Sequence, residues 1–398
     1  MANFTPKVFG SRATRGGAGS LVAGALAVGT LGAPAAAEGA RPVRPEVRRV
    51  MEQAVAEGGV PGMLVEIREG HQRRFGAAGV ADTATGRARQ PQERYRIGST
   101  TKTFTATVIL QLAAERRLGL DDTVERWLPG LVRGNGNDGR KITIRHLLSM
   151  TSGLFNYSLD PAMLTRYYSP AFMRHRFDRY TPEQLVKIAM GHAPDYAPGM
   201  DWAYSNTGYI LAGMIIERVT GSSYAEQVDQ RIIRPLRLTG TYVPGNETQL
   251  RGPHARHYST HSVPQADAPV HDVTQMSAST SWAAGGMVST TGDLTRFFQA
   301  LLRGWLLPPA QQRQMFATAA TPQGKWIPDT TYGLGVSSIK LPCGTTVWGM
   351  GGAINGSFSF TYGTRDGRHM MAQNVNGDWN NPIDTFTKAL DAEFCTKA

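Results

Sequence analysis

A serine and a lysine stand three residues apart where an apolar run begins. Residues 96–104 read Arg-Ile-Gly-Ser-Thr-Thr-Lys-Thr-Phe, and residues 105–118 are apolar at helical spacing up to Gly119, where the glycine predicts a C-cap. Residues i and i+3 share a helix face, so Ser99 Oγ and Lys102 Nζ can meet. A lysine against apolar walls can lose its charge and activate a hydroxyl. The stretch predicts nucleophilic catalysis by Ser99; the alternative is an N-cap serine beside a solvated lysine.

The same four-residue pattern occurs a second time, from Ser337 to Lys340. That copy lies in residues 332–341, which have the composition of a strand. An offset of three in a strand places two side chains on opposite faces. We therefore expect no chemistry from the second copy.

Two further stretches could act together with Ser99. In Tyr204-Ser205-Asn206, a nearby ammonium would make the phenol easier to ionise, so Tyr204 could move a proton between Ser99 and a leaving amine. Asn206 offers a donor and an acceptor that could orient Lys102 and a substrate amide. Residues 348–352 read as a late strand of small residues, against whose edge a substrate backbone could lie.

The elements that must position these residues divide the chain into three parts. Strands are expected at 62–68, 74–80, 332–341, 345–350, 357–363 and 370–374, and helices at 43–57, 142–150, 182–190, 209–219, 224–233, 294–303 and 384–394. Both ends of the chain thus supply strands, and the middle supplies helices. This order predicts an α+β fold, with one antiparallel sheet built from N- and C-terminal strands, flanked by helices and interrupted by a mostly helical insertion.

Two loop-rich stretches leave alternatives open. Residues 155–180 are crowded with Tyr, Phe, Met and Arg, and could either wall a cleft or form an irregular surface. Residues 251–272 contain four histidines, His254, His257, His261 and His271. Three prolines and the lack of a regular helix there argue against a preset metal site, so we predict no metal and no cofactor.

The first 37 residues have the pattern of a secretory signal peptide. A basic head is followed by a small-residue apolar run over about 16–33 and by Ala35-Ala36-Ala37, an A-x-A cleavage site. The alternative is a membrane anchor, which the weak hydrophobicity of the run disfavours. We therefore expect a secreted protein, with one catalytic domain over 38–398. A sheet subdomain would span about 38–98 plus 283–398, and a helical subdomain about 99–282.

The net charge limits the binding partners that we expect, and the cysteine content suggests a cross-link. The net charge of +11 would fall to +8 without residues 1–37, which hold three Lys/Arg and no acid. A basic exported protein suits an anionic cell envelope, while the scattered charge argues against nucleic-acid binding.

The two cysteines, Cys343 and Cys395, suggest one disulfide in an exported chain; the alternative is two free thiols.

These stretches, in this order, resemble the penicillin-recognising serine hydrolases. The resemblance covers nearly all of 38–398 and is strongest to secreted actinomycete D-alanyl-D-alanine carboxypeptidases/transpeptidases, which are related to class C β-lactamases. Supporting stretches are 79–82, 85–86, 147–149, 152–154, 281–283, 332–335, Cys343-Gly344 and Phe394-Cys395. The resemblance implies a beta-lactamase/transpeptidase-like fold and supports the disulfide.

Site roles follow from the resemblance. It implies Ser99 as the acylated nucleophile, Lys102 as its base partner and Tyr204 as the second proton carrier. Asn206 would contact substrate and Lys102, and Trp282 would line the acyl pocket. The backbone N–H groups of Ser99 and Ala353 would form the oxyanion hole.

The chain departs from the family where a substrate carboxylate is read. The third motif of the family has His or Lys, then Thr or Ser, then Gly, whereas this chain has Met350, Gly351 and Gly352. The carboxypeptidases have another hydroxyl at the position of Ala353, and an arginine at that of Ser337. A carboxylate buried without a cation is costly, so we expect altered recognition of the C-terminal carboxylate.

The predicted function is therefore acyl transfer from an amide or ester bond through an acyl-enzyme at Ser99, with small peptides containing D-residues as the expected substrates. β-Lactams and cell-wall peptide are further expected ligands, and the protein is expected to be a monomer. Two alternatives are transfer of the acyl group to an amine and a penicillin- or wall-peptide-binding protein with little turnover. A Ser-His-Asp hydrolase is disfavoured because no G-x-S-x-G elbow is present.

Overall fold

The structure is a computed structural model of the chain, and it describes residues 40–261 and 268–395. The expected signal peptide at 1–37 lies outside these residues and stays a prediction. In the two described ranges, no helix is both long enough and apolar enough to cross a bilayer.

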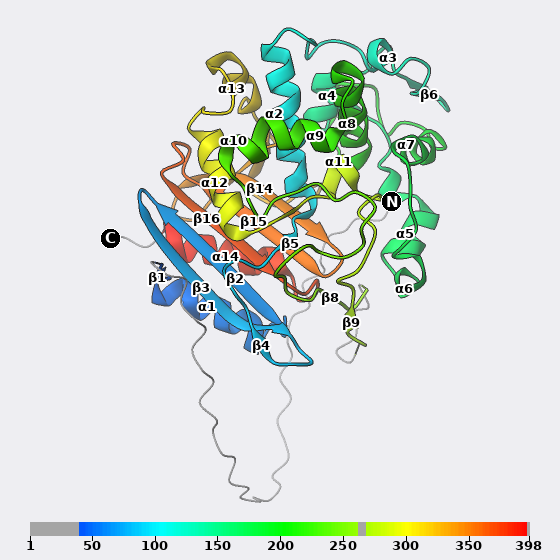
Figure 1. Cartoon of the computed structure of the whole chain (residues 1–398). Coiled ribbons are helices and arrows are strands. Elements are labelled where there is room, and N and C mark those ends of the chain that lie inside the picture. Colours follow the sequence, from blue (N-terminus) through cyan, green and yellow to red (C-terminus); the bar gives the residue numbers. More distant parts are fainter. Residues whose placement is uncertain (1–39, 262–267, 396–398) are drawn as a thin grey trace, which may run out of the picture.

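A ten-stranded sheet joins the two ends of the chain (Figure 1). Its order is β1-β3-β2-β16-β15-β14-β13-β12-β11, with β4 beside β3. The strands are β1 (Arg41–Pro42), β2 (Gly62–Glu69), β3 (Gln72–Asp82), β4 (Arg87–Ala88), β11 (Ala319–Ala320), β12 (Thr330–Tyr332), β13 (Ser337–Lys340), β14 (Thr346–Ile354), β15 (Ser357–Gly363) and β16 (His369–Val375). All pairs are antiparallel except β1 with β3, and β2 meets β16 from Met63↔Val375 to Glu69↔His369. The predicted sheet from both termini is confirmed.

Helices cover both faces of the sheet. α1 (Pro45–Ala56) and α14 (Pro382–Phe394) pack on one face, over a core that includes Val47, Val65, Phe360 and Phe386. On the opposite face lie α12 (Thr291–Leu302), α2 (Thr101–Ala114) and the inserted helical region. A larger core there includes Phe104, Leu211, Phe297 and Met350.

The inserted region consists mainly of short helices joined by loops. They are α3 (Val124–Trp127), α4 (Ile144–Leu148), α5 (Pro161–Tyr167), α6 (Phe172–His175), α7 (Pro182–Met190), α8 (Asn206–Thr220), α9 (Tyr224–Val228), the π-turn η3 (Asp229–Ile233), α10 (Arg234–Leu236) and α11 (Trp282–Gly285), and α13 (Pro309–Met315) follows α12. The 3₁₀ turns η1 (Gly98–Thr100) and η2 (Tyr157–Leu159) flank the site. Two-strand ribbons pair β5 (Tyr95–Arg96) with β10 (Val288–Ser289), β6 (Arg133–Gly134) with β7 (Asn137–Asp138), and β8 (Tyr258–Ser259) with β9 (His271–Asp272).

Two predicted boundaries are wrong for identifiable reasons. α2 ends at Ala114, before Gly119, because Arg116 adopts φ +58° and the amide of Arg117 bonds back to the Leu112 carbonyl. The strand predicted at 332–341 is two strands, since the chain turns at Gly335 (φ +75°). A methyl group there would lie 2.6 Å from the Ala106 side chain, so this glycine lets the turn approach α2.

The second Ser-x-x-Lys copy forms β13, as the strand pattern predicted. Ser337 is buried, and its hydroxyl lies 2.7 Å from that of Tyr362, whereas Lys340 is exposed. The two side chains do not meet.

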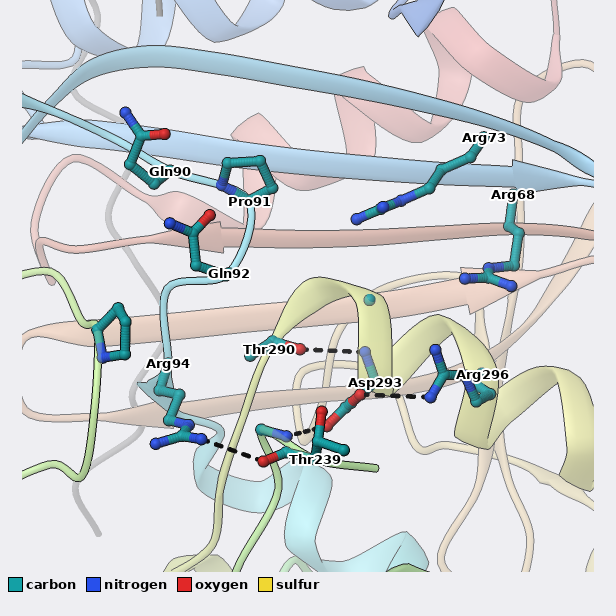
Figure 2. A pocket seen from close by; sticks show the side chains of 13 residues that line it. Arg68, Arg73, Gln90, Pro91, Gln92, Arg94, Thr239, Thr290, Asp293 and Arg296 are labelled. Carbon is teal, nitrogen blue, oxygen red and sulfur yellow. Dashed lines mark hydrogen bonds and ion pairs between the residues drawn. The ribbon is translucent and has the colours of Figure 1, made fainter. Parts of the chain in front are cut away.

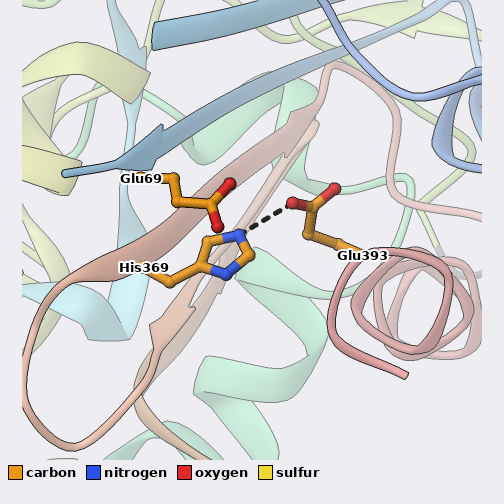
Figure 3. Close-up of side chains that lie close together, drawn as sticks. All are labelled: Glu69, His369 and Glu393. Carbon is orange, nitrogen blue, oxygen red and sulfur yellow. Dashed lines mark hydrogen bonds and ion pairs between the residues drawn. The ribbon is translucent and has the colours of Figure 1, made fainter. Parts of the chain in front are cut away.

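Covalent and ionic contacts fasten α14 to the sheet. A disulfide joins Cys343 to Cys395, as predicted. Beside it, the buried Glu393 carboxylate lies 2.7 Å from His369 Nε2 (Figure 3). The same carboxylate accepts two bonds from Arg74, which also bonds to Glu69 at 3.0 Å. Glu69, His369 and Glu393 are close enough to share a cation, but the Arg74 guanidinium already bonds to both carboxylates, and Arg44 lies 3.9 Å from Glu393. This cluster is therefore best explained as a structural clamp.

Candidate active site

Ser99 lies in a tight turn that β14 approaches closely. It follows Gly98, which has φ +50°, and both belong to η1 just before α2. A methyl group on Gly98 would lie 2.6 Å from the backbone nitrogen of Ala353, and one on Gly352 would lie 2.7 Å from that of Ser99. The two glycines therefore allow the start of α2 and the edge of β14 to touch.

Lys102 is buried and contacts three oxygens. Its Nζ lies 3.0 Å from Ser99 Oγ, 2.7 Å from Asn206 Oδ1 and 2.6 Å from the Ala284 carbonyl. No carboxylate appears among these partners, and burial lowers the pKa of Lys102 well below its ordinary value. A neutral amine has two N–H donors and one lone pair. The two carbonyl oxygens can only accept, so they take both donors and leave the lone pair for the Ser99 hydroxyl.

Tyr204 contacts the same serine from the other side. Its hydroxyl donates to Ser99 Oγ at 2.5 Å, and its ring stacks on Trp326 with 4.6 Å between centroids. Burial raises the pKa of Tyr204 well above its ordinary value, with a further contribution from Tyr332. The expectation that Tyr204 ionises easily is therefore wrong. It assumed an ammonium nearby, whereas burial of Lys102 disfavours its charged form.

Asn206 is held by two residues that the sequence analysis did not identify. It begins α8, and its backbone N–H donates to Asn156 Oδ1 at 3.2 Å. Its amide nitrogen donates to Ser158 Oγ at 3.2 Å, which turns Oδ1 toward Lys102. Nothing in the local pattern marks Asn156 or Ser158, since their role depends on a loop that returns to α8 from 50 residues away.

The edge of β14 next to Ser99 has no partner strand within the described ranges. Pairing with β13 stops at Ser337↔Gly349, whereas pairing with β15 continues to Ile354↔Ser357. Alternate residues of 350–354 therefore direct backbone N–H and C=O groups toward a free edge. This edge could bind an extended substrate backbone, as the small residues of the stretch predicted.

A cleft opens beside Ser99, and the side chains that the structure shows along it carry no charge. It is lined by Tyr157, Ser158, Met163, Tyr167, Tyr168, Asn206, Met276, Thr280, Ser281, Gly285, Ala353, Ile354 and Asn355. Five of these residues come from the stretch 155–180, so the cleft-wall interpretation of that stretch is confirmed. Tyr157 supports the wall, because its buried hydroxyl donates to the Thr280 carbonyl at 2.5 Å.

Three of the four positions that depart from the family, Met350, Ser337 and Gly351, supply no cation to this cleft. Met350 is fully buried in the core on the helical side of the sheet. Ser337 is buried as well, with its hydroxyl directed to Gly349 and Tyr362. A methyl group on Gly351 would lie 2.5 Å from the Phe360 ring, so that ring leaves no room for the hydroxyl residue of the family motif.

The structure does not bring Trp282 to the cleft. Its ring packs on Tyr224, 5.3 Å away between centroids, and a methyl group on Gly213 would lie 2.8 Å from it. The same short helix, α11, reaches the site through other groups: Gly285 lines the cleft, and the Ala284 carbonyl accepts from Lys102. The motif at residues 281–283 predicted that this segment lies at the site, but it did not predict the direction of the Trp282 side chain.

Comparison with known proteins agrees with this architecture. The Beta-lactamase family model matches residues 47–395. A D-stereospecific amidohydrolase from Streptomyces sp. is similar in structure, with a TM-score of 0.82 and 47% identity, over 90% of this chain and 100% of that chain. A D-amino acid amidase from Ochrobactrum anthropi SV3, complexed with L-phenylalanine amide, has a TM-score of 0.75 and 25% identity, over 87% and 97% of the chains.

The chain belongs to the beta-lactamase family, and is a serine hydrolase of the beta-lactamase and penicillin-binding-protein type. Among curated proteins it resembles penicillin-binding protein 4* of Bacillus subtilis, with 28% identity over 267 residues, 65% of this chain and 55% of that protein. The chain spans 37% to 55% of the length of the curated relatives it matches.

Proposed function

We propose that this protein hydrolyses amide or ester bonds next to D-amino-acid residues through an acyl-enzyme at Ser99. The observation that carries the proposal is the pair of contacts that Ser99 Oγ makes, with Lys102 Nζ at 3.0 Å and with Tyr204 OH at 2.5 Å, beside a cleft whose described side chains carry no charge. The names of the amidohydrolase and the amidase support an amide substrate and D-selectivity.

In the proposed acylation, the side chains of Ser99, Lys102 and Tyr204 are all neutral before the reaction begins. Ser99 Oγ bonds to the substrate carbonyl carbon as its proton passes to Lys102, and the carbonyl electrons move onto oxygen. The C–N bond then breaks, and the proton reaches the leaving nitrogen through the Tyr204 hydroxyl. Water repeats the sequence on the ester, so that the carboxylic acid is released and all three groups return to their starting forms.

The backbone N–H groups of Ser99 and Ala353 would stabilise the oxyanion. Both nitrogens lie at the contact between Gly98 and Gly352, where η1 meets the free edge of β14. Fixed donors at that position would favour the tetrahedral intermediate over the substrate.

A free C-terminal carboxylate is not needed in this proposal. Among the described residues that line the cleft there is no cation to pair with it, and Met350 and Ser337 are buried. Desolvating a carboxylate without a partner is unfavourable, so amides and esters would be preferred to peptide acids.

We further propose that the protein is exported and acts as a monomer. The signal pattern in residues 1–37 and the disulfide support export. All the groups of the proposed reaction come from one chain, so a second subunit is not required. Sedimentation velocity of the mature chain would give a single species of one chain's mass; activity found only in an oligomer would refute this.

Intact-mass spectrometry tests the proposed function. The wild type and Ser99→Ala would be incubated with D- and L-phenylalanine amide, with paired D-Ala-ending peptide acid and amide, and with a penicillin. The proposal predicts turnover of D-amides, faster than of L-amides, with no product and no adduct for Ser99→Ala. A lasting penicillin adduct without turnover would favour the binding protein, and a peptide amide formed from an added amine would show acyl transfer.

A further inference from the structure

A second cavity lies on the α12 side of the sheet and shares no residue with the cleft (Figure 2). Its volume is about 550 Å³. It is lined by Arg68, Arg73, Gln90, Pro91, Gln92, Arg94, Thr239, Gly240, Pro253, Thr290, Gly292, Asp293 and Arg296. The reaction proposed for Ser99 uses none of these residues.

The wall of this cavity is strongly basic. Four arginines line it, Arg68 and Arg73 from the β2–β3 hairpin and Arg94 and Arg296 from two other segments, and Asp293 is the one carboxylate among the lining residues described. A neighbouring cavity of about 410 Å³ shares Arg68 and Arg73 and adds His71 and Arg303. We call the two cavities together the arginine groove.

Most of this positive charge lacks a close carboxylate. Arg94 donates to the carbonyls of Arg251 and Thr239, at 2.6 and 3.1 Å. Arg296 donates to the Arg237 carbonyl, and its nearest carboxylate contact, with Asp293, is 3.9 Å long. Carbonyl oxygens orient a guanidinium without neutralising it.

Arg68 and Arg73 add further positive charge to the cavity, where the two cavities of the groove adjoin. Arg73 forms a two-bond pair with Glu66 at 2.9 and 3.0 Å, but Arg68 reaches the same carboxylate only at 3.9 Å. The buried Nε of Arg68 has no hydrogen-bond partner. Burial lowers the pKa of Arg68, and the charges of Arg296 and Arg73 lower it further, against the opposing effect of Glu66.

The start of α12 faces the same cavity. Thr290 caps this 12-residue helix, and Gly292 and Asp293 belong to its first turn. The N-terminal end of a helix carries partial positive charge. Asp293 is already engaged by the Gly240 amide and the Thr241 hydroxyl, which occupy its Oδ2 atom.

We propose that the arginine groove is a second binding site, for a polyanion with repeated phosphate groups. Guanidinium groups bind phosphate through paired, directed hydrogen bonds, and several of them spaced along two adjoining cavities match several phosphates better than one. Such a site would hold the protein on a phosphate-bearing polymer while leaving the cleft free.

Titration with inorganic polyphosphate tests the proposal, with polyaspartate as the matched carboxylate polymer. The double variant Arg94→Gln/Arg296→Gln should raise the Kd for polyphosphate about tenfold or more, while amide hydrolysis by Ser99 is unchanged. The control Arg48→Gln/Arg49→Gln removes the same charge from two exposed positions on α1 and should change Kd less than about twofold.

Three results would overturn the proposal. The first is that Arg48→Gln/Arg49→Gln raises the Kd for polyphosphate as much as Arg94→Gln/Arg296→Gln does. The second is that Arg94→Gln/Arg296→Gln leaves this Kd unchanged. The third is that the wild type binds polyaspartate as tightly as polyphosphate. Thermal unfolding would report whether Arg94→Gln disturbs the fold, because Arg94 holds two loop carbonyls. If Arg94→Gln lowers the unfolding temperature, the double variant Arg296→Gln/Arg303→Gln is used instead, and it should raise the Kd for polyphosphate by the same factor.

Discussion

Three oxygens around Lys102 explain how a buried lysine can serve as a base. The Asn206 amide and the Ala284 carbonyl take its two N–H donors, so its lone pair faces Ser99. Because burial disfavours the charged form of Lys102, that residue also gives Tyr204 little electrostatic reason to ionise. At the residue scale the site is thus a set of neutral donors and acceptors in which the proton of Ser99 has one favourable place to go.

The activity should therefore fall on the acid side of the pH profile. Protonation of Lys102 removes its lone pair, and burial lowers its pKa well below the ordinary value. For an N-acylated amide substrate, which has no titrating amine, kcat/KM should drop as the pH falls through the lowered pKa of Lys102 and be flat above that pKa. A rate that still rises tenfold per pH unit through pH 9 would instead indicate an ionised Tyr204 as the base.

Burial of Lys102 should also make stability depend on pH. The folded pKa lies below the unfolded value of about 10.4, so between the two values the unfolded chain binds more protons and stability rises with pH. Relative to Lys102→Met, the wild type should gain free energy of unfolding as pH rises toward about 10, measured by urea denaturation. A pH-independent difference between the two proteins would contradict a depressed pKa.

At the element scale, β14 does the most to shape the site. It pairs with β15 along its length, loses β13 after Gly349, and touches η1 through Gly352. Its small residues are required on both faces, since Gly352 meets the start of α2 and Gly351 meets Phe360. The strand can thus offer its edge to substrate only with this composition.

Gly351→Thr should destabilise the protein. The new side chain would begin 2.5 Å from the Phe360 ring, and overpacking of this kind costs about 1–3 kcal/mol. Urea denaturation of Gly351→Thr, Phe360→Ala and the double variant would measure how much of the free-energy cost comes from the Phe360 ring. The cost of Gly351→Thr should shrink when Phe360 is absent, and an equal cost in both backgrounds would show that the ring is not its cause.

The disulfide should matter for stability and not for the reaction. It links positions 52 residues apart and fastens α14, which takes no part in the cleft. Cys343→Ser/Cys395→Ser should lower the free energy of unfolding by about 4 kcal/mol on the chain-entropy account. Hydrolysis per folded molecule should be unchanged. A large loss of kcat at full folding would mean that α14 supports the site.

The elements were more predictable than the contacts between them. Sequence patterns predicted the strands 62–68 and 357–363 and the helix 182–190 nearly as observed, because most residues of both strands are buried and the helix buries one face. The break at Gly335 and the packing of Trp282 depend on neighbours distant in sequence. Motif spacing could predict Ser99, Lys102, Tyr204 and Asn206, but not the supports Asn156, Ser158 and Trp326, which no local pattern distinguishes.

At the scale of the whole molecule, the site exists because the two ends of the chain share a sheet. β2 and β16 pair along their length, which brings β14 against the helix that follows the first strands (Figure 1). The helical insertion then supplies Tyr204, Asn206 and the cleft wall. The arginine groove lies apart from this cleft, so catalysis and attachment to a polyanion would be separable functions of one fold.

The central claim is that the reaction machinery of the family is present while recognition of a free carboxylate is lost. The most direct test is the ratio of kcat/KM for a D-Ala-ending peptide amide and the matching peptide acid, with Ser99→Ala as the blank. The account predicts that the amide is cleaved about tenfold faster or more, since the cleft pairs no cation with the acid. Efficient cleavage of the acid, abolished by amidation of its terminus, would contradict it.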